Sequence, residues 1–164
     1  MCSSDLATLG RGSADEQAWR SLPGALLADQ ELDPAFVAQS LSLPSELELV
    51  TGLTEADPGA LMEARETVAA TLAREHRDLL LARYDALAAE GGDGIDARSS
   101  GRRALKNACL SLLMRLGEGE VVDRCVAQLH GARTMTDEQA ALELLCHLDD
   151  PARDEAVARF RERW

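Results

Sequence analysis

The sequence lacks the features that would place it in a membrane, on nucleic acid or among disulfide-bonded secreted proteins. No apolar run reaches the ~20 residues that span a bilayer, and the first residues lack the charged-then-apolar order of a signal sequence. Basic residues are few, 17 against 29 acidic, and the net charge of −12 repels phosphate backbones and anionic lipids. The four cysteines show no CxxC spacing, which favours a reducing compartment. We therefore expect a cytoplasmic protein that binds neither nucleic acid nor membranes.

Catalytic and metal-binding motifs are also missing. No HExxH, P-loop, GxSxG or paired-cysteine motif occurs. Glu143 and His147 share a helical face, but an exposed i,i+4 pair explains them better than a metal site does. His76 is expected on a solvated helix face among charges of both signs, and His130 near a helix end, where a cation suits the dipole. We assign no catalytic residue, metal ligand or cofactor to this chain, and an enzyme in its own right is the least favoured class.

Aromatic residues make up only 3% of the chain and alternating β-branched runs are absent, so little favours strands. Leu, Ala, Glu and Arg dominate, and three aspartates precede prolines, an arrangement that suits a helix start. Helices are expected at 14–28, 34–41, 46–51, 58–90, 98–116, 118–130, 137–148 and 151–163. Short connections favour antiparallel neighbours, so an all-α bundle or stack is predicted, although no repeat of fixed period is found.

The predicted domain organisation is simple. Residues 1–12 are expected to form a loose leader, and residues 13–164 a single helical domain. Cys109, Cys125 and Cys146 fall within apolar helical patterns, where a free thiol behaves as a small core residue.

The segment GRRALKNACLSLLMRLG, residues 101–117, is the exception in this acidic chain. No carboxylate occurs between Asp96 and Glu118, and basic residues crowd the gap. Two explanations stay open for the basic side chains near the helix start. Either they lie in water or pair with acids of this chain, or they face carboxylates of another domain, for which arginine's planar fork is suited. The candidate interdomain contact consists of Arg98, Arg102, Arg103 and Lys106.

The same segment carries a family resemblance. GRRALKNACLSLL (101–113) resembles a motif in the C-terminal helical domain of bacterial aminopeptidase N, a zinc metallopeptidase of the gluzincin group. LDPAFVAQSLSLPSE (32–46) and DPGALMEARETV (57–68) resemble that domain's opening helices, and MTDEQAAL (135–142) resembles the stretch after the basic helix. The resemblance covers about residues 22–164. One departure is SLLMRLG, where the family often carries an aromatic residue after the CL pair.

The resemblance implies stacked antiparallel helix pairs in a HEAT- or armadillo-like superhelical array, as part of a larger domain. In the family, two histidines and a glutamate of a separate catalytic domain bind zinc, and no position here matches those motifs. The implied role is a non-catalytic fragment that helps enclose the zinc active-site chamber, where N-terminal residues are removed from short peptides. Its partners would be the remaining domains of the parent, and a surface exposed by truncation would favour self-association. The alternative is a free-standing helical scaffold that binds a partner protein.

Overall fold

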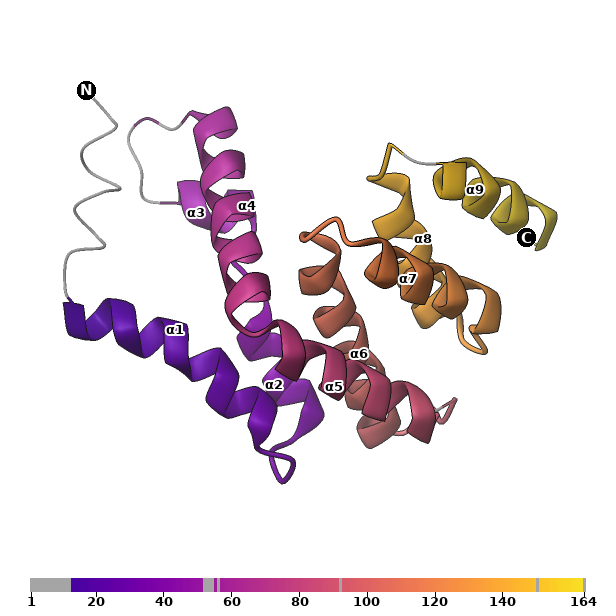
Figure 1. Cartoon of the computed structure of the whole chain (residues 1–164), viewed down its shortest axis with the longest axis horizontal. Helices are drawn as coiled ribbons and strands as arrows, with labels where there is room; N and C mark the ends of the chain where they lie inside the picture. The colour runs from indigo at the N-terminus through magenta and orange to yellow at the C-terminus, as the bar shows by residue number, and fades with distance from the viewer. Residues whose placement is uncertain (1–12, 52–54, 56, 92, 150, 164) are drawn as a thin grey trace.

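The computed structural model describes residues 13–51, 55, 57–91, 93–149 and 151–163. These residues form nine helices and no strand (Figure 1), which confirms the predicted all-α fold. The helices are α1 (Ser13–Ala28), α2 (Pro34–Leu41), α3 (Glu46–Val50), α4 (Pro58–Glu75), α5 (Arg77–Glu90), α6 (Ala97–Met114), α7 (Gly119–Gly131), α8 (Met135–Cys146) and α9 (Pro151–Arg163). The predicted leader, residues 1–12, lies outside the described residues.

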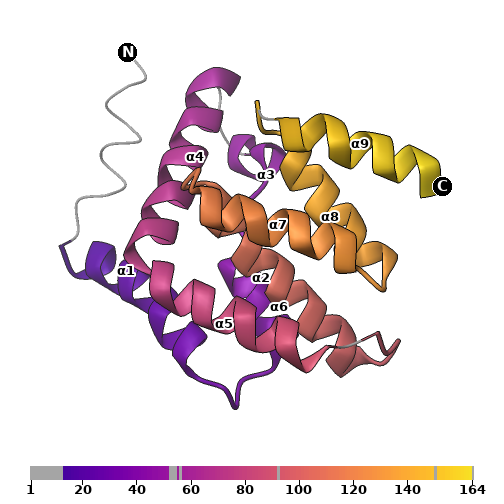
Figure 2. The ribbon, with the colours of Figure 1, turned by 45° about the vertical axis from the view of Figure 1, so that its right-hand side comes forward.

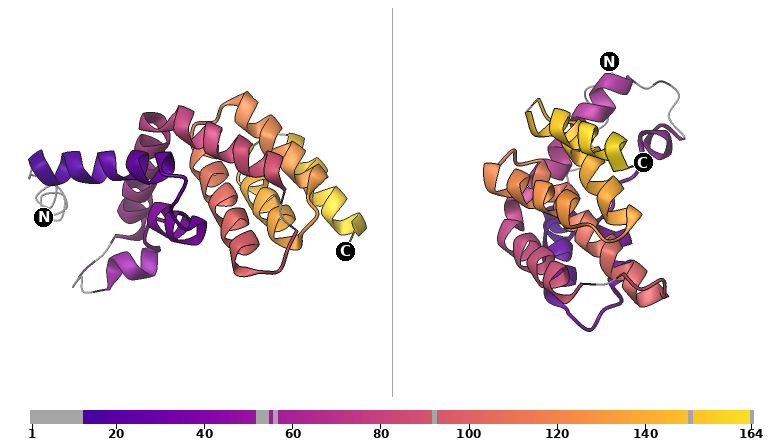
Figure 3. Two further views of the ribbon diagram at one scale, coloured as in Figure 1. Left: turned by 90° about the horizontal axis from the view of Figure 1, so that it is seen from below. Right: turned by 90° about the vertical axis from the view of Figure 1, so that its right-hand side faces the viewer.

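The helices succeed one another along the long axis of the molecule, with α1 at one end and α9 at the other (Figure 3). Neighbours in sequence pack together: α5 on α6, α7 on α8, and α8 on α9. The result is a helical array of the repeat-like type that the sequence predicted. No described helix combines the length and the apolar composition that a bilayer span requires.

Helix α6 lies at the centre of this array (Figure 2) and contacts α2, α4, α5, α7 and α8. Its apolar stripe is wholly buried, with Leu105, Cys109 and Leu113 each 0% exposed. Where α2 crosses α6, Gly101 approaches so closely that a Cβ atom there would lie 3.0 Å from the backbone nitrogen of Ala35. The lack of a side chain at Gly101 therefore sets the distance between these two helices.

Two of the predicted Asp-Pro pairs mark helix starts, with Asp33 and Asp57 as the N-cap residues of α2 and α4. The carboxylate of Asp33 accepts hydrogen bonds from Ala35 N and Phe36 N at 2.8 and 3.1 Å. Asp57 accepts in the same way from Gly59 N at 2.9 Å. The third pair begins at Asp150, which lies outside the described residues. At the other two starts a side chain satisfies backbone donors that the helix leaves unpaired.

The single helix predicted over residues 58–90 is wrong, because the chain breaks at His76 into α4 and α5. The backbone of His76 adopts φ −115° and ψ 19°, outside the helical region. Its ring is half-buried, with Nε2 2.7 Å from the carbonyl oxygen of Arg20, and it lies against Gly24 of α1. The expected solvated position of His76 is therefore also wrong. The break turns the imidazole toward α1, which a continuous surface helix would not do.

Two of the three cysteines expected in the core are there. Cys109 and Cys125 are both 0% exposed, which confirms their prediction. Cys146 is exposed, so its prediction is wrong. It is the last residue of α8, whereas Cys109 and Cys125 lie in the interior of α6 and α7.

Candidate functional site

The basic segment forms the first half of α6, and a carboxylate begins that helix. Asp96 accepts hydrogen bonds from the hydroxyl (2.7 Å) and the backbone N–H (2.9 Å) of Ser99, which hold the pKa of its carboxyl below the ordinary value. A negative charge at this position offsets the positive end of the helix dipole, which by itself disfavours arginines in the first turns. Helix α6 therefore begins at Ala97, one residue before the predicted start, with Arg98 in its first turn.

Three of the four candidate contact residues have partners within the chain. Lys106 Nζ lies 2.7 Å from Asp137 Oδ2, and Arg102 forms an ion pair with the last residue of α5, Glu90. Arg103 donates to two neutral oxygens, the carbonyl of Gly94 at 2.7 Å and the hydroxyl of Ser100 at 3.1 Å. These contacts within the chain agree with the first of the two explanations.

Arg98 differs from the other three. It is exposed, and its side chain forms no hydrogen bond or ion pair with any residue that the structure describes. The interdomain contact itself stays a prediction for all four residues.

Three of these basic residues line a pocket of about 350 Å³ between α5, α6, α7 and the connection that leads to α8. Two further arginines complete it, Arg124 from α7 and Arg133 from the connection. We call it the basic pocket, and its cationic residues are Arg102, Arg103, Lys106, Arg124 and Arg133. Sequence analysis missed Arg124 and Arg133, because nothing in the chain order places them opposite the basic helix.

A buried polar network forms one wall of the basic pocket. The Gln128 side chain donates from Nε2 to Asn107 Oδ1 (2.8 Å) and to the backbone oxygen of Asp137 (3.1 Å), and its Oε1 accepts from the Tyr84 hydroxyl (3.1 Å). Asn107 in turn donates to Asp137 Oδ1 at 3.1 Å. Four helices, α5 to α8, are thereby joined through satisfied polar groups, which fixes the shape of the pocket.

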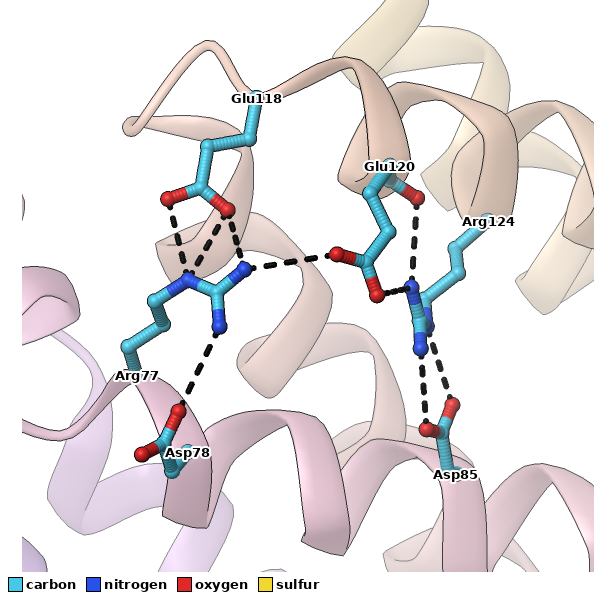
Figure 4. Close-up of polar contacts among 6 residues, drawn as sticks. All are labelled: Arg77, Asp78, Asp85, Glu118, Glu120 and Arg124. Atoms are coloured by element: carbon cyan, nitrogen blue, oxygen red, sulfur yellow. Dashed lines mark hydrogen bonds and ion pairs between the residues drawn. The ribbon is translucent and has the colours of Figure 1, made fainter.

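Arg124 of the basic pocket also belongs to an ion-pair network between α5 and α7 (Figure 4). Arg124 bonds Asp85 at 3.1 Å and Glu120 at 2.7 Å. Arg77 donates to Glu118 from Nη2 to Oε2 at 2.6 Å and from Nε to Oε1 at 3.0 Å, and these hydrogen bonds hold the pKa of the Glu118 carboxyl below its ordinary value. The geometry is bidentate, the favourable one for an arginine with a carboxylate. Both arginines therefore connect α5 to the start of α7.

Burial raises the pKa of three interior groups, Tyr84, Cys109 and Cys125. Desolvation raises the pKa of Tyr84 to about 12, with smaller contributions from neighbouring acidic groups. The same cause raises the pKa of the Cys109 and Cys125 thiols to about 12. A thiol with such a pKa carries almost no thiolate at neutral pH, so neither cysteine is a nucleophile. Among the side chains that the structure describes, no three His, Cys, Asp or Glu gather where they could share a metal ion.

These features define a helical-repeat domain whose polar groups join helices and line one basic pocket. The chain belongs to the family described as "domain of unknown function (DUF3458_C) ARM repeats", whose sequence model matches residues 3–164. The chain is 37% identical over 141 residues to aminopeptidase N of Escherichia coli K12, which covers 85% of the chain and 16% of that relative. It is 32% identical over 162 residues to aminopeptidase N of Caulobacter vibrioides, which covers 97% of the chain and 19% of that relative.

A solved structure shares the fold. The crystal structure of Legionella pneumophila aminopeptidase A in complex with aspartic acid matches with a TM-score of 0.77 and 26% sequence identity. The match covers 88% of this chain and 18% of that chain. The chain thus spans less than a fifth of the length of each of these three relatives. The resemblance to the C-terminal helical domain of aminopeptidase N is confirmed.

Proposed function

We propose that this chain is the non-catalytic helical part of an aminopeptidase N, and that it helps to enclose the zinc active-site chamber there. The observation that supports the proposal is the match to two aminopeptidase N sequences along 85% and 97% of the chain. The chain itself contains no zinc-binding HExxH motif, so the zinc and the hydrolysis are assigned to the remaining domains. A closed chamber admits short peptides, from which N-terminal residues are removed, and excludes folded proteins.

The partners in this proposal are the other domains of the parent protein, and the location is the cytoplasm. The net charge of −12 argues against nucleic acid and anionic membranes as partners. Several large apolar side chains are exposed on the chain, and such surface is expected to be covered by other domains or by self-association. They include Leu22, Phe36, Leu47, Met62 and Met135.

The proposal is tested by comparing the 164-residue chain with the polypeptide encoded by its whole natural reading frame. The longer polypeptide is expected to retain zinc after dialysis and to hydrolyse aminoacyl chromogenic substrates. The 164-residue chain is expected to do neither. Zinc retention by the short chain, or a reading frame that encodes nothing beyond it, would contradict the proposal. The second result would favour a free-standing scaffold that binds a partner protein.

A further inference from the structure

We propose that a groove on the face of α5 and α6 is a docking site for a carboxylate-bearing, apolar-faced segment of another part of the same longer polypeptide. This inference rests on the proposed function, which places the chain inside such a polypeptide. It also identifies the partner chemistry of the contact that the sequence predicted at Arg98. The groove, called the α5–α6 groove below, runs between the α1–α2 connection, α5 and the start of α6. Its volume is about 960 Å³.

Several apolar side chains line the α5–α6 groove. Leu27 and Leu87 line it from the core side, and Leu79 lines it with 40% of its surface exposed. Three alanines of α5 and α6 also line the groove, Ala82, Ala86 and Ala97. Covering these apolar side chains with another apolar face removes them from water, which favours association.

Two arginines with no partner line the same groove. Neither the Arg83 nor the Arg98 side chain forms a hydrogen bond or ion pair with a residue that the structure describes. The Nε atom of Arg83 is, in addition, inaccessible to solvent and has no acceptor. A carboxylate that enters the groove can therefore bond the terminal nitrogens of Arg83 but not its Nε. In contrast, Arg77 and Arg124 of the adjoining α5–α7 network have carboxylate partners.

The groove's own acids leave these two arginines available. Asp33 is occupied at the start of α2, and Glu90 is occupied by Arg102. Glu31 is the remaining carboxylate of the lining and is exposed. Two guanidinium groups in the same groove as these apolar side chains therefore favour a partner that presents carboxylates beside apolar side chains, with arginine's fork suited to bidentate binding.

The overall charge favours a segment of the longer polypeptide over a second copy of the chain. Each copy carries a net charge of −12, so two copies repel each other before any groove contact forms. A segment of the same polypeptide is held nearby at high effective concentration and needs only local complementarity. We therefore assign the groove to an intramolecular partner.

The first experiment measures how fast p-hydroxyphenylglyoxal modifies individual arginines, by peptide mass spectrometry, in the 164-residue chain. Hexanoate is expected to slow the modification of Arg98 about fivefold. Hexanol, which lacks the charge, and hexylammonium, which reverses it, are expected to leave the rate unchanged. The control site is Arg161, an exposed arginine of α9 without a partner in the described residues. Equal effects of the three probes, or equal protection of Arg161, would overturn the proposal.

The second experiment repeats the measurement on the polypeptide from the whole reading frame. Arg98 is expected to react about tenfold more slowly there than in the 164-residue chain, without any added probe. An unprotected Arg98 in a polypeptide that hydrolyses aminoacyl substrates would overturn the docking proposal and leave the proposed function intact. Loss of hydrolysis alone would count against the proposed function. Protection that rises with the concentration of the 164-residue chain would mean that a second copy fills the groove, and would also overturn the proposal.

Discussion

Among single residues, Gln128 is the buried side chain on which four helices converge. It is 8% exposed, and both ends of its amide have partners on other helices. An apolar replacement cannot supply those hydrogen bonds, so the Tyr84 hydroxyl and the Asn107 amide would each lose one. Desolvated groups without partners destabilise a protein more than the same groups stabilise it when paired.

We predict that Gln128→Ala lowers the free energy of unfolding by about 1–3 kcal/mol, because it removes three hydrogen bonds from a largely buried network. Urea denaturation followed by circular dichroism measures the change. The matched control is Gln39→Ala, at an exposed position of α2, which is expected to stay within about 0.5 kcal/mol of the original chain. Equal losses for the two variants would contradict the role given to Gln128.

The chain's single tyrosine allows its burial to be tested directly by pH titration. The pKa of Tyr84 is raised from 10.0 to about 12 in the folded state. Phenolate absorbance is therefore expected near pH 12 in the folded chain and near the ordinary value in the unfolded chain. Because the folded pKa is the higher one, the associated stability is fully present below pH 10 and is lost as the pH rises toward 12. Titration of the folded chain at the ordinary value would contradict this burial.

Sequence patterns identified some of these residues and could not identify others. The basic residues of α6 stand out because they are close together in an acidic chain, and the core position of Cys109 follows from helical spacing. Arg124 and Arg133 carry no such signal, because they join the basic pocket only where α7 and the connection after it lie beside α5 and α6. His76 was misplaced because its charged neighbours indicate a solvated face, whereas its own ring contacts Arg20.

Among the elements, the α2–α6 contact depends on close backbone approach. At Gly101 an added Cβ atom would lie 3.0 Å from Ala35 N and 3.2 Å from Ala35 Cβ. Ala35 belongs to a helix held at its start by Asp33, so it cannot shift without disturbing that cap. The Asp-Pro pairs made α2 and the start of α4 predictable, whereas no glycine or proline marks the break between α4 and α5.

We predict that Gly101→Ala destabilises the chain by about 1–3 kcal/mol, because the helices must move apart to admit the methyl group. Gly119→Ala is the control, since nothing lies within 4 Å of the corresponding Cβ position in α7. Thermal denaturation of both variants measures the difference. A Gly101→Ala variant as stable as the Gly119→Ala variant would show that α2 is free to shift.

The α5–α7 ion pairs predict a pH dependence. Hydrogen bonds from Arg77 lower the pKa of Glu118 below 4.5, so this carboxylate stabilises the folded state above that pH. Glu118→Gln is expected to lower the melting temperature at neutral pH. The difference from the original chain should shrink as the pH falls through the depressed pKa. Glu155→Gln, at an exposed position of α9 without a partner in the described residues, is expected to show no such trend.

For the molecule as a whole, α6 connects the two ends of the array. It contacts α2 and α4 on one side and α7 and α8 on the other, and its Leu105 is 0% exposed. The all-α class and the array were predictable from helical spacing and from family resemblance. The central place of α6 was not, because it depends on which helices lie beside which.

We predict that Leu105→Ala lowers the free energy of unfolding by about 2–5 kcal/mol, because it leaves a cavity in the central helix. The unfolding transition is expected to stay single, since both sides of the array lose the same support. Leu47→Ala, at a position 75% exposed in α3, is the control and should change stability little. Two separate transitions in the Leu105→Ala variant would mean that the ends of the array fold independently.

The break at His76 also has a geometric consequence for the far end of the molecule. Two helices joined through one non-helical residue need not share an axis, and the backbone angles at His76 set how α5 leaves α4. Helix α6 packs on α5, and α7 to α9 follow from α6. The carbonyl of Arg20 and the space beside Gly24 hold the imidazole. These two features of α1 therefore contribute to the orientation of α6 to α9, although α1 itself packs on α2 and α5.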